Sequence, residues 1–185
     1  MPECWLIRHG ETEWSRVRRH TGRTDLPLTA DGELAATALT ERLRGVHFDL
    51  VLASPLQRAW RTAQLAGLAP EAEPNAMEWD YGVYEGRTTV DIRSERPDWS
   101  IWHDGVPDGE NLEDVAKRAD AVVARVRSEA LERAVVVAHA HFLRIFAARW
   151  LDESPHLARH LAMETAKLSV VAWDRGIPVI DRWNG

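Results

Sequence analysis

Short apolar runs alternate with segments of helical periodicity along most of the chain. Runs at residues 4–8, 48–54 and 134–139 are bounded by glycine, proline or polar residues, which is typical of strands buried on both faces. The segment from Asp31 to Gly45 predicts a helix, with Asp31 near its N-cap and Gly45 at its end. Its expected apolar stripe comprises Leu34, Ala35, Ala38, Leu39 and Leu43.

Three further helices and a hairpin follow from the same patterns. A helix is predicted over residues 55–67, with Ser54 and Pro55 marking its start. A longer helix begins after Asn111, and another covers residues 142–151. The apolar runs 167–174 and 177–183 predict a closing hairpin that turns at Arg175 and Gly176.

The stretch from Glu71 to Asn111 is irregular and rich in Trp, Pro, Gly and acidic residues, with one short helix expected near residues 88–96. So long an excursion is often an active-site wall. Trp79, Trp99 and Trp102 are therefore the tryptophans expected to contact a substrate.

Alternating strands and helices predict an α/β fold, a three-layer α/β/α architecture with a mainly parallel sheet, built as one domain over residues 1–185. In such sheets, ligands bind at the carboxyl ends of the strands. His9 and His139 both stand at that end of a predicted strand.

Composition narrows the possible functions. A net charge of −6 and scattered Lys and Arg residues argue against nucleic acid as a partner. We expect no membrane partner, because there is no signal peptide and no apolar run long enough to span a bilayer. Cys4 is the single cysteine, which excludes an intrachain disulfide and a multi-thiolate metal site and favours the reducing cytoplasm.

Arg8, His9, Arg58 and His139 form a set suited to a phosphoryl group. Two guanidinium groups can bind its anionic oxygens, while one imidazole attacks phosphorus and the other donates hydrogen bonds. Any one such residue taken alone would more often solvate a sheet edge. The arginines supply the positive charge in this scheme, so we expect no metal and no cofactor.

Two histidine pairs offer an alternative metal interpretation, and both are disfavoured. His139 and His141 alternate, and His156 and His160 are four residues apart, but neither pair comes with the carboxylate spacing of a zinc or di-metal site.

Four separated motifs carry a family resemblance. The segments "LIRHGETEW", "SPLQRAWRTA", "MEWDYGVYEG" and "VVVAHAHFLR" closely resemble the histidine phosphatase superfamily, which has the phosphoglycerate-mutase-like fold. The resemblance implies a phosphohistidine mechanism with His9 as nucleophile and with Arg8, Arg58 and His139 around the phosphate. Glu78 would protonate the leaving oxygen and then activate water, which requires a raised pKa.

The resemblance also implies phosphate- or substrate-binding positions at Ser15, Thr21, Gly22 and Arg144, although Gly22 could equally be a turn residue and Arg144 part of a solvated helix face. Ala140 occupies a position where the family usually has glycine. Its methyl group could crowd the phosphate or demand a compatible φ, which puts the level of activity in question.

Within the family, the chain most resembles sedoheptulose-1,7-bisphosphatase and the small bacterial broad-specificity acid phosphatases. Few Lys or Arg residues lie between Gly86 and Asn111, which favours hydrolysis over a mutase. The expected substrate is a small phosphorylated metabolite such as a sugar phosphate. The alternatives are a phosphoglycerate mutase and a catalytically weak phosphate-ester-binding regulatory module. The sequence leaves the oligomeric state open.

Overall fold

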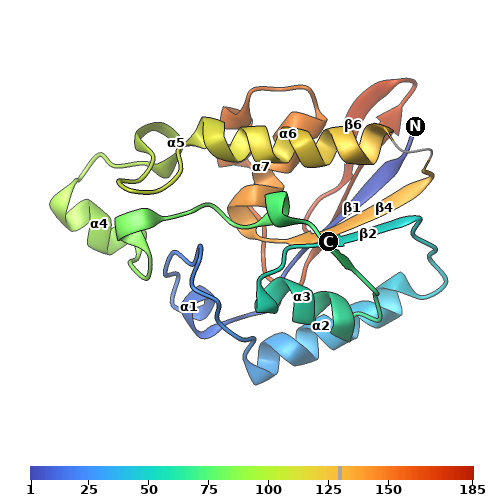
Figure 1. Ribbon diagram of the computed structural model, residues 1–185, viewed down its shortest axis with the longest axis horizontal. Helices are drawn as coiled ribbons and strands as arrows, with labels where there is room; N and C mark the ends of the chain where they lie inside the picture. Colours follow the sequence, from blue (N-terminus) through green and yellow to red (C-terminus); the bar gives the residue numbers. More distant parts are fainter. Residues whose placement is uncertain (129–130) are drawn as a thin grey trace.

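A six-stranded sheet forms the centre of the molecule, with strand order β3-β2-β4-β1-β5-β6 (Figure 1). The computed structural model describes residues 1–128 and 131–185. The strands are β1 (Glu3–Arg8), β2 (Leu50–Ala53), β3 (Glu71–Ala72), β4 (Arg133–Ala138), β5 (Leu168–Asp174) and β6 (Ile177–Arg182). β1, β2, β3 and β4 pair in parallel, whereas β5 pairs antiparallel with both β1 and β6.

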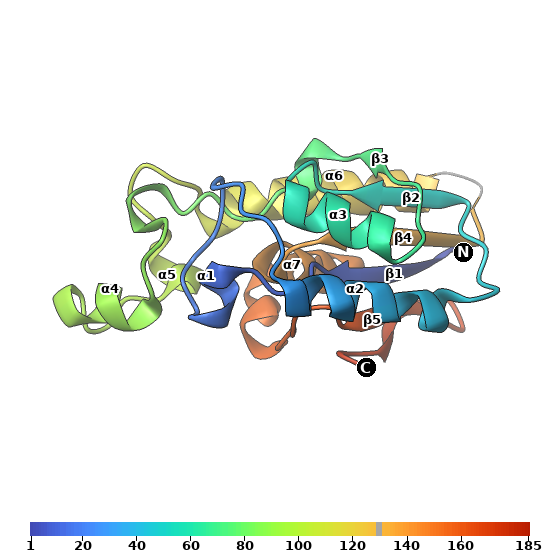
Figure 2. The same cartoon turned by 90° about the horizontal axis from the view of Figure 1, so that it is seen from below.

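Helices cover both faces of this sheet, as Figures 1 and 2 show. One face is covered by α2 (Ala30–Leu43) and α3 (Gln57–Leu65), the other by α6 (Leu112–Ser128) and α7 (Ala140–Trp150). Successive side chains of β4 point to opposite faces of the sheet, so the strand packs against both helical layers. Val136 packs in the cluster that contains α6 and α7, while Val135 and Val137 pack in the cluster that contains α2 and α3. The predicted three-layer α/β/α fold is confirmed.

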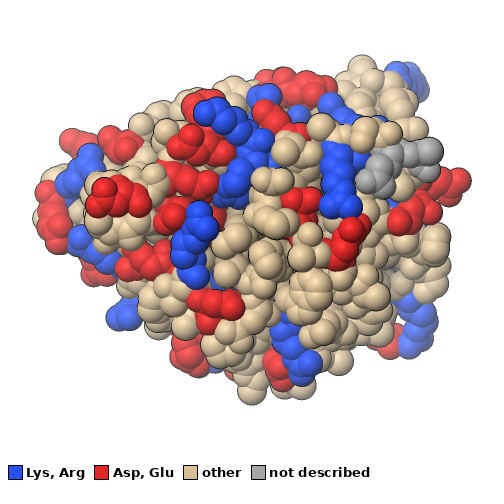
Figure 3. Space-filling model, viewed as in Figure 1, with Lys and Arg blue, Asp and Glu red and all other residues tan. Residues whose placement is uncertain are grey.

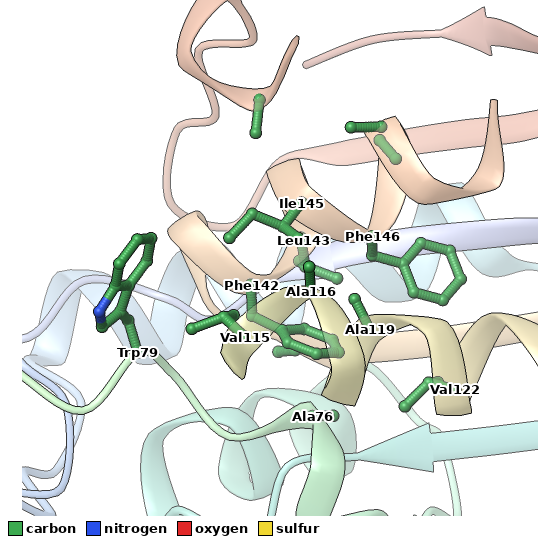
Figure 4. Close-up of a cluster of buried hydrophobic side chains, with 14 of the residues drawn as sticks. Ala76, Trp79, Val115, Ala116, Ala119, Val122, Phe142, Leu143, Ile145 and Phe146 are labelled. Atoms are coloured by element: carbon green, nitrogen blue, oxygen red, sulfur yellow. The ribbon is translucent and has the colours of Figure 1, made fainter. Parts of the chain in front are cut away.

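The larger hydrophobic cluster includes the contact between α6 and α7. Figure 4 shows Val115 and Ala119 of α6 beside Phe142 and Phe146 of α7, all fully buried. The predicted cap of α6 is also present, because the Asp114 backbone N–H donates to the Asn111 side chain at 3.0 Å.

The apolar stripe predicted for α2 was partly wrong. Leu34 is 70% exposed, and Ala35 and Ala38 are exposed as well. The buried positions are Gly32, Ala36, Leu39 and Leu43. The helix is rotated because Gly32 packs directly against the turn after β1: a Cβ on Gly10 would lie 2.5 Å from the Gly32 carbonyl oxygen. The cap is Thr29 and not Asp31, with the Gly32 N–H donating to the Thr29 hydroxyl.

The excursion contains more structure than the sequence predicted. The expected short helix is α4 (Thr89–Glu95), which Thr88 caps. Missed were the single turns η1 (Pro74–Ala76), η2 (Gly82–Tyr84) and α5 (Ile101–Asp104). Turns this short give little periodic signal. Elsewhere, α1 (Glu13–Arg16) and η3 (Pro155–His160) were also missed.

The C-terminal hairpin forms as predicted. β5 and β6 are joined at Arg175 (φ 49°) and Gly176 (φ 85°), a pair of left-handed residues that suits a two-residue hairpin turn. On the face drawn in Figure 3, basic side chains are interspersed with acidic ones. No helix in the described residues is long and apolar enough to cross a membrane.

Candidate active site

Two histidines meet where β1 and β4 end side by side. Arg8 pairs with Ala138 in the parallel register, and the His9 N–H donates to the Ala138 carbonyl at 2.9 Å. This register places the His9 and His139 rings 5.2 Å apart, centroid to centroid. The predicted meeting of the two strand ends is therefore present.

The His9 ring is held in the state that a nucleophile needs. Its Nδ1 lies 2.7 Å from the Gly10 carbonyl oxygen, so Nδ1 carries the proton and donates, and Nε2 is left unprotonated. Burial, together with the charges of Arg8 and Arg58, lowers the His9 pKa well below 6.5. The imidazole stays neutral as a result.

His139 is oriented by a residue to which the sequence analysis gave a different role. Its Nε2 lies 2.8 Å from the Ser54 hydroxyl, and both side chains are fully buried. Ser54 does not start α3, which begins at Gln57 without a side-chain cap. The Ser54 hydroxyl also accepts the Leu56 N–H at 3.4 Å. When this hydroxyl donates to Nε2, the His139 proton resides on Nδ1.

Arg8 and Arg58 are fixed by backbone carbonyls. Arg58 donates to the carbonyls of Thr21, Gly22 and Thr24 at 2.9–3.0 Å, and Arg8 donates to that of Met163 at 2.6 Å. Burial lowers the pKa of both groups, yet a guanidinium remains charged at physiological pH. No carboxylate forms an ion pair with either group in the described part of the chain, so their charge is available to an anion.

Three buried polar atoms near His9 lack a hydrogen-bond partner in the described chain. Arg8 Nε, Arg58 Nε and His139 Nδ1 are all buried and have no hydrogen-bond partner within the described residues. Such donors are rare in a folded protein, since each one left unpaired destabilises the fold by about 1–3 kcal/mol. All three belong to residues close to His9, and together they suit the oxygens of a phosphoryl group.

Glu78 lies in the same region as a buried carboxyl group. Burial raises its pKa above 4.5, although three backbone N–H donors and Arg58 act in the opposite direction. Those donors are Trp79 and Phe142 to Oε1 and His141 to Oε2, at 3.0–3.1 Å. They hold the carboxyl group in one orientation.

A cavity of about 490 Å³ opens above these groups. Ser15, Thr21, Ala140 and Arg144, all predicted from the family resemblance, line it. The Ser15 hydroxyl is engaged in the capping box of α1 with Thr12. The remaining residues that line the cavity are Arg8, His9, Arg18, Arg19, His20, Glu78, Tyr81, His141, Ala162, Met163 and Glu164.

Gly22 lies outside the cavity lining. Its N–H donates to the carboxylate of Glu85 at 2.9 Å, so this donor is not directed at a phosphate. A Cβ at this position would lie 2.4 Å from the Trp79 carbonyl oxygen, which explains the glycine. Glu85 also accepts the Thr24 N–H, and it thereby fixes the loop whose carbonyls hold Arg58.

Ala140 is compatible with the backbone that it occupies. It is the first residue of α7, and it is absent from the positive-φ residues of the chain. The φ strain considered from the sequence therefore does not arise.

The aromatic walls of the cavity are not the predicted tryptophans. Trp79 and Trp99 are buried in the core, and Trp102 stacks on Arg144 without lining the cavity. The walls are Tyr81, His20 and His141, none of which was predicted from the sequence as a wall. Nothing in their spacing distinguishes them from core residues.

The Tyr81 hydroxyl lies 2.6 Å from His141 Nδ1. Burial raises the Tyr81 pKa well above 10 and lowers that of His141 well below 6.5, so Tyr81 donates to a neutral ring. His141 was considered above only as a metal ligand. It lies in the first turn of α7 and lines the cavity. The described residues contain no group of three His, Cys, Asp or Glu side chains that could hold a metal.

Comparison with known proteins identifies the family. The family model of the histidine phosphatase superfamily (branch 1) matches residues 4–185, and the chain belongs to this family. An acid phosphatase of Mycobacterium tuberculosis is 39% identical over 93% of this chain and 87% of its own length. The sedoheptulose 1,7-bisphosphatase of Saccharomyces cerevisiae is 33% identical over 80% of this chain and 67% of its own length.

A solved structure shows the same fold. The product of an open reading frame from Mycobacterium tuberculosis superposes with a TM-score of 0.95 at 36% identity, covering 99% of this chain and 97% of that one. The predicted family, fold and phosphatase activity are thus confirmed.

Proposed function

We propose that the chain hydrolyses small phosphomonoesters through a phosphohistidine formed on His9. This proposal depends on the state of the His9 ring. Its Nδ1 is hydrogen-bonded to the Gly10 carbonyl, which leaves Nε2 unprotonated, and buried donors without partners lie close to the ring. A neutral imidazole beside fixed cations can attack an anionic phosphoryl group without first losing a proton.

In the first step, His9 Nε2 forms a bond to phosphorus while the bond to the ester oxygen breaks. Glu78 gives its proton to that oxygen, so an alcohol leaves and Glu78 becomes a carboxylate. Arg8, Arg58 and His139 Nδ1 stabilise the charge on the remaining phosphoryl oxygens.

In the second step, water attacks phosphorus and the Glu78 carboxylate accepts its proton. The bond between phosphorus and His9 Nε2 breaks, which returns a neutral ring and a protonated Glu78 and releases inorganic phosphate. The positive charge in both steps comes from the two arginines, which supports metal-independent hydrolysis.

The substrate class is supported by the cavity and by the relatives. A volume of about 490 Å³ suits a small metabolite. The named relatives are an acid phosphatase and a phosphatase of sedoheptulose 1,7-bisphosphate, which favours a sugar phosphate or a related compound. We infer a cytoplasmic setting from the single cysteine, which is buried.

The test is phosphate release by EDTA-treated protein, combined with trapping of the phosphoenzyme. Wild type should release phosphate from sugar phosphates and should yield an acid-labile, base-stable phosphoryl label after rapid quenching. His9→Ala should lose both, with turnover reduced at least about 10⁴-fold because no other side chain replaces the nucleophile. Undiminished turnover in His9→Ala would refute the mechanism.

Two further outcomes separate the alternatives. Transfer of the label to a second position of 3-phosphoglycerate, without release of phosphate, would identify a mutase. Binding of phosphate esters without label or release would identify a regulatory module.

A further inference from the structure

The cavity extends beyond the residues that a phosphoryl group needs. Its inner end holds His9, Arg8 and Glu78, with Arg58 and His139 buried close by. The outer part, which we call the rim, includes Arg18, Arg19, Arg144 and Glu164. Three cations face one carboxylate there, although the chain as a whole has a charge of −6.

Arg18 and Arg19 belong to a loop with a defined backbone. The Arg18 N–H donates to the Ser15 carbonyl, and the Arg19 N–H donates to that of Trp14 at 2.9 Å. Arg19 also forms an isolated bridge with Thr88. Arg18 has a φ of 58°, a left-handed conformation that is uncommon for a residue with a long side chain. Such conformations concentrate at ligand sites.

These two arginines also differ from their neighbours in the sequence. Arg16 pairs with Glu11 at 2.8 Å, and Arg23 pairs with Asp80 at 3.0 Å. Arg18 and Arg19 are exposed, and neither makes a side-chain hydrogen bond or an ion pair within the described residues.

Asp91 and Arg144, two other charged groups of this region, have their own partners. The pKa of Asp91 is lowered chiefly by its hydrogen bonds to Thr88, and Arg19 contributes only through space. On the rim, Arg144 donates to the carbonyls of Ala158 and Arg159, while Glu164 contributes to the field at Arg8. Arg18 and Arg19 are therefore the rim arginines whose side chains make no hydrogen bond within the described residues.

We propose that Arg18 and Arg19 bind a second anionic group of the substrate, a carboxylate or a second phosphate. This proposal rests on the proposed function, because it places the scissile phosphoryl group at His9. Guanidinium groups favour such oxyanions through paired N–H donors. A substrate with a distal anion would span the cavity from His9 to the rim, whereas a neutral analogue would leave the rim arginines in water.

The test compares matched substrates that differ only in the distal group. 3-Phosphoglycerate and glycerol 3-phosphate differ in a carboxylate, and hexane-1,6-diol bisphosphate and its monophosphate differ in a phosphate. Wild type should prefer the doubly anionic member of at least one pair. Arg18→Gln and Arg19→Gln should each reduce this preference, measured as a ratio of kcat/KM values, about tenfold.

Arg16→Gln is the matched control, because this arginine precedes the same loop but is ion-paired and absent from the cavity lining. It should leave the ratio within twofold of wild type. An unchanged ratio in the Arg18→Gln, Arg19→Gln double variant, or no preference in wild type, would overturn the inference.

Failure of the proposed function gives a different result. If no ester were hydrolysed, calorimetry with His9→Ala protein would still compare 3-phosphoglycerate with glycerol 3-phosphate. Tighter binding of 3-phosphoglycerate that is lost in the triple variant His9→Ala, Arg18→Gln, Arg19→Gln would support the anion site. Equal affinities would refute it.

Discussion

The inner end of the cavity and its rim are built in opposite ways. At the inner end, His9, Arg58 and His139 are buried, and backbone carbonyls or Ser54 fix each side chain. On the rim, Arg18 and Arg19 are exposed and lack side-chain partners in the described chain. Fixed groups suit a transition state of constant shape, whereas exposed guanidinium groups adapt to different ligands.

This difference separates rate from selectivity. Substitutions at the inner end should change kcat for every substrate, because the reacting phosphoryl group is common to all of them. Substitutions on the rim should change the order of preference among substrates. The contrast would be broken if an inner-end variant discriminated between substrates that differ only in a distal anionic group, or if a rim variant reduced the turnover of all substrates equally.

Among substitutions other than that of His9, the largest effect is expected from Glu78→Gln, which removes the proposed proton donor. kcat should fall about 10²–10⁴-fold for esters with alkoxide leaving groups. An aryl phosphate should lose much less, since its leaving group needs no proton. Parallel loss for alkyl and aryl esters would argue against the assignment.

The same residue sets the expected pH dependence. Glu78 must be protonated, and burial raises its pKa, so the active fraction falls as pH rises through that value. His9 must be neutral to attack phosphorus. Because its pKa is lowered well below 6.5, the loss of activity on the acid side should begin only as the pH falls to this lowered pKa. Hydrolysis should thus be fastest at acidic pH. Glu78→Gln should lose the alkaline decline in kcat/KM.

A smaller effect is expected from Ser54→Ala, which releases His139 Nε2. Without this bond, His139 can place its proton on either nitrogen, so kcat should fall about 10–100-fold with little change in KM. Ser54→Thr should restore most of the loss, and ¹⁵N chemical shifts should show a mixed His139 tautomer only in Ser54→Ala. The matched control is Ser169→Ala, another fully buried serine whose hydroxyl accepts the Asn184 N–H. An unaltered tautomer would contradict the positioning role.

The smallest effect is expected from Ala140→Gly. Because Ala140 begins α7 without a positive φ, the methyl group should not limit the reaction. kcat/KM should change by less than about threefold, within the range of a helix-terminal substitution. A large increase would show that the methyl group crowds the phosphate.

The sequence predicted the inner end better than the rim, for physical reasons. His9 and His139 follow continuous apolar strands, and parallel strands bring their carboxyl ends together. Periodicity likewise located α6, whose apolar positions Leu112, Val115, Ala119, Val122, Val123 and Val126 are all buried. These predictions needed only local sequence patterns and the rule that parallel strands bring their carboxyl ends to one edge of the sheet.

Other features could not be predicted from the sequence, because they depend on tertiary contacts. The rotation of α2 depends on the contact between Gly10 and Gly32, which no periodicity reveals. Tyr81 and Trp79 are both buried, but only Tyr81 lines the cavity. The irregular chain at this point has no period from which this difference could be predicted. The role of Ser54 arises from a partner 85 residues away along the chain.

The carboxylate of Glu85 links two parts of the molecule that would otherwise look independent. It lies in the excursion, yet it holds the N–H groups of Gly22 and Thr24, in the loop whose carbonyls bind Arg58. Grafting the excursion of a relative into this chain to redesign its specificity would therefore disturb Arg58 as well. A chimera would keep its phosphate-binding arginine in place only if the transplanted segment carried an equivalent acid.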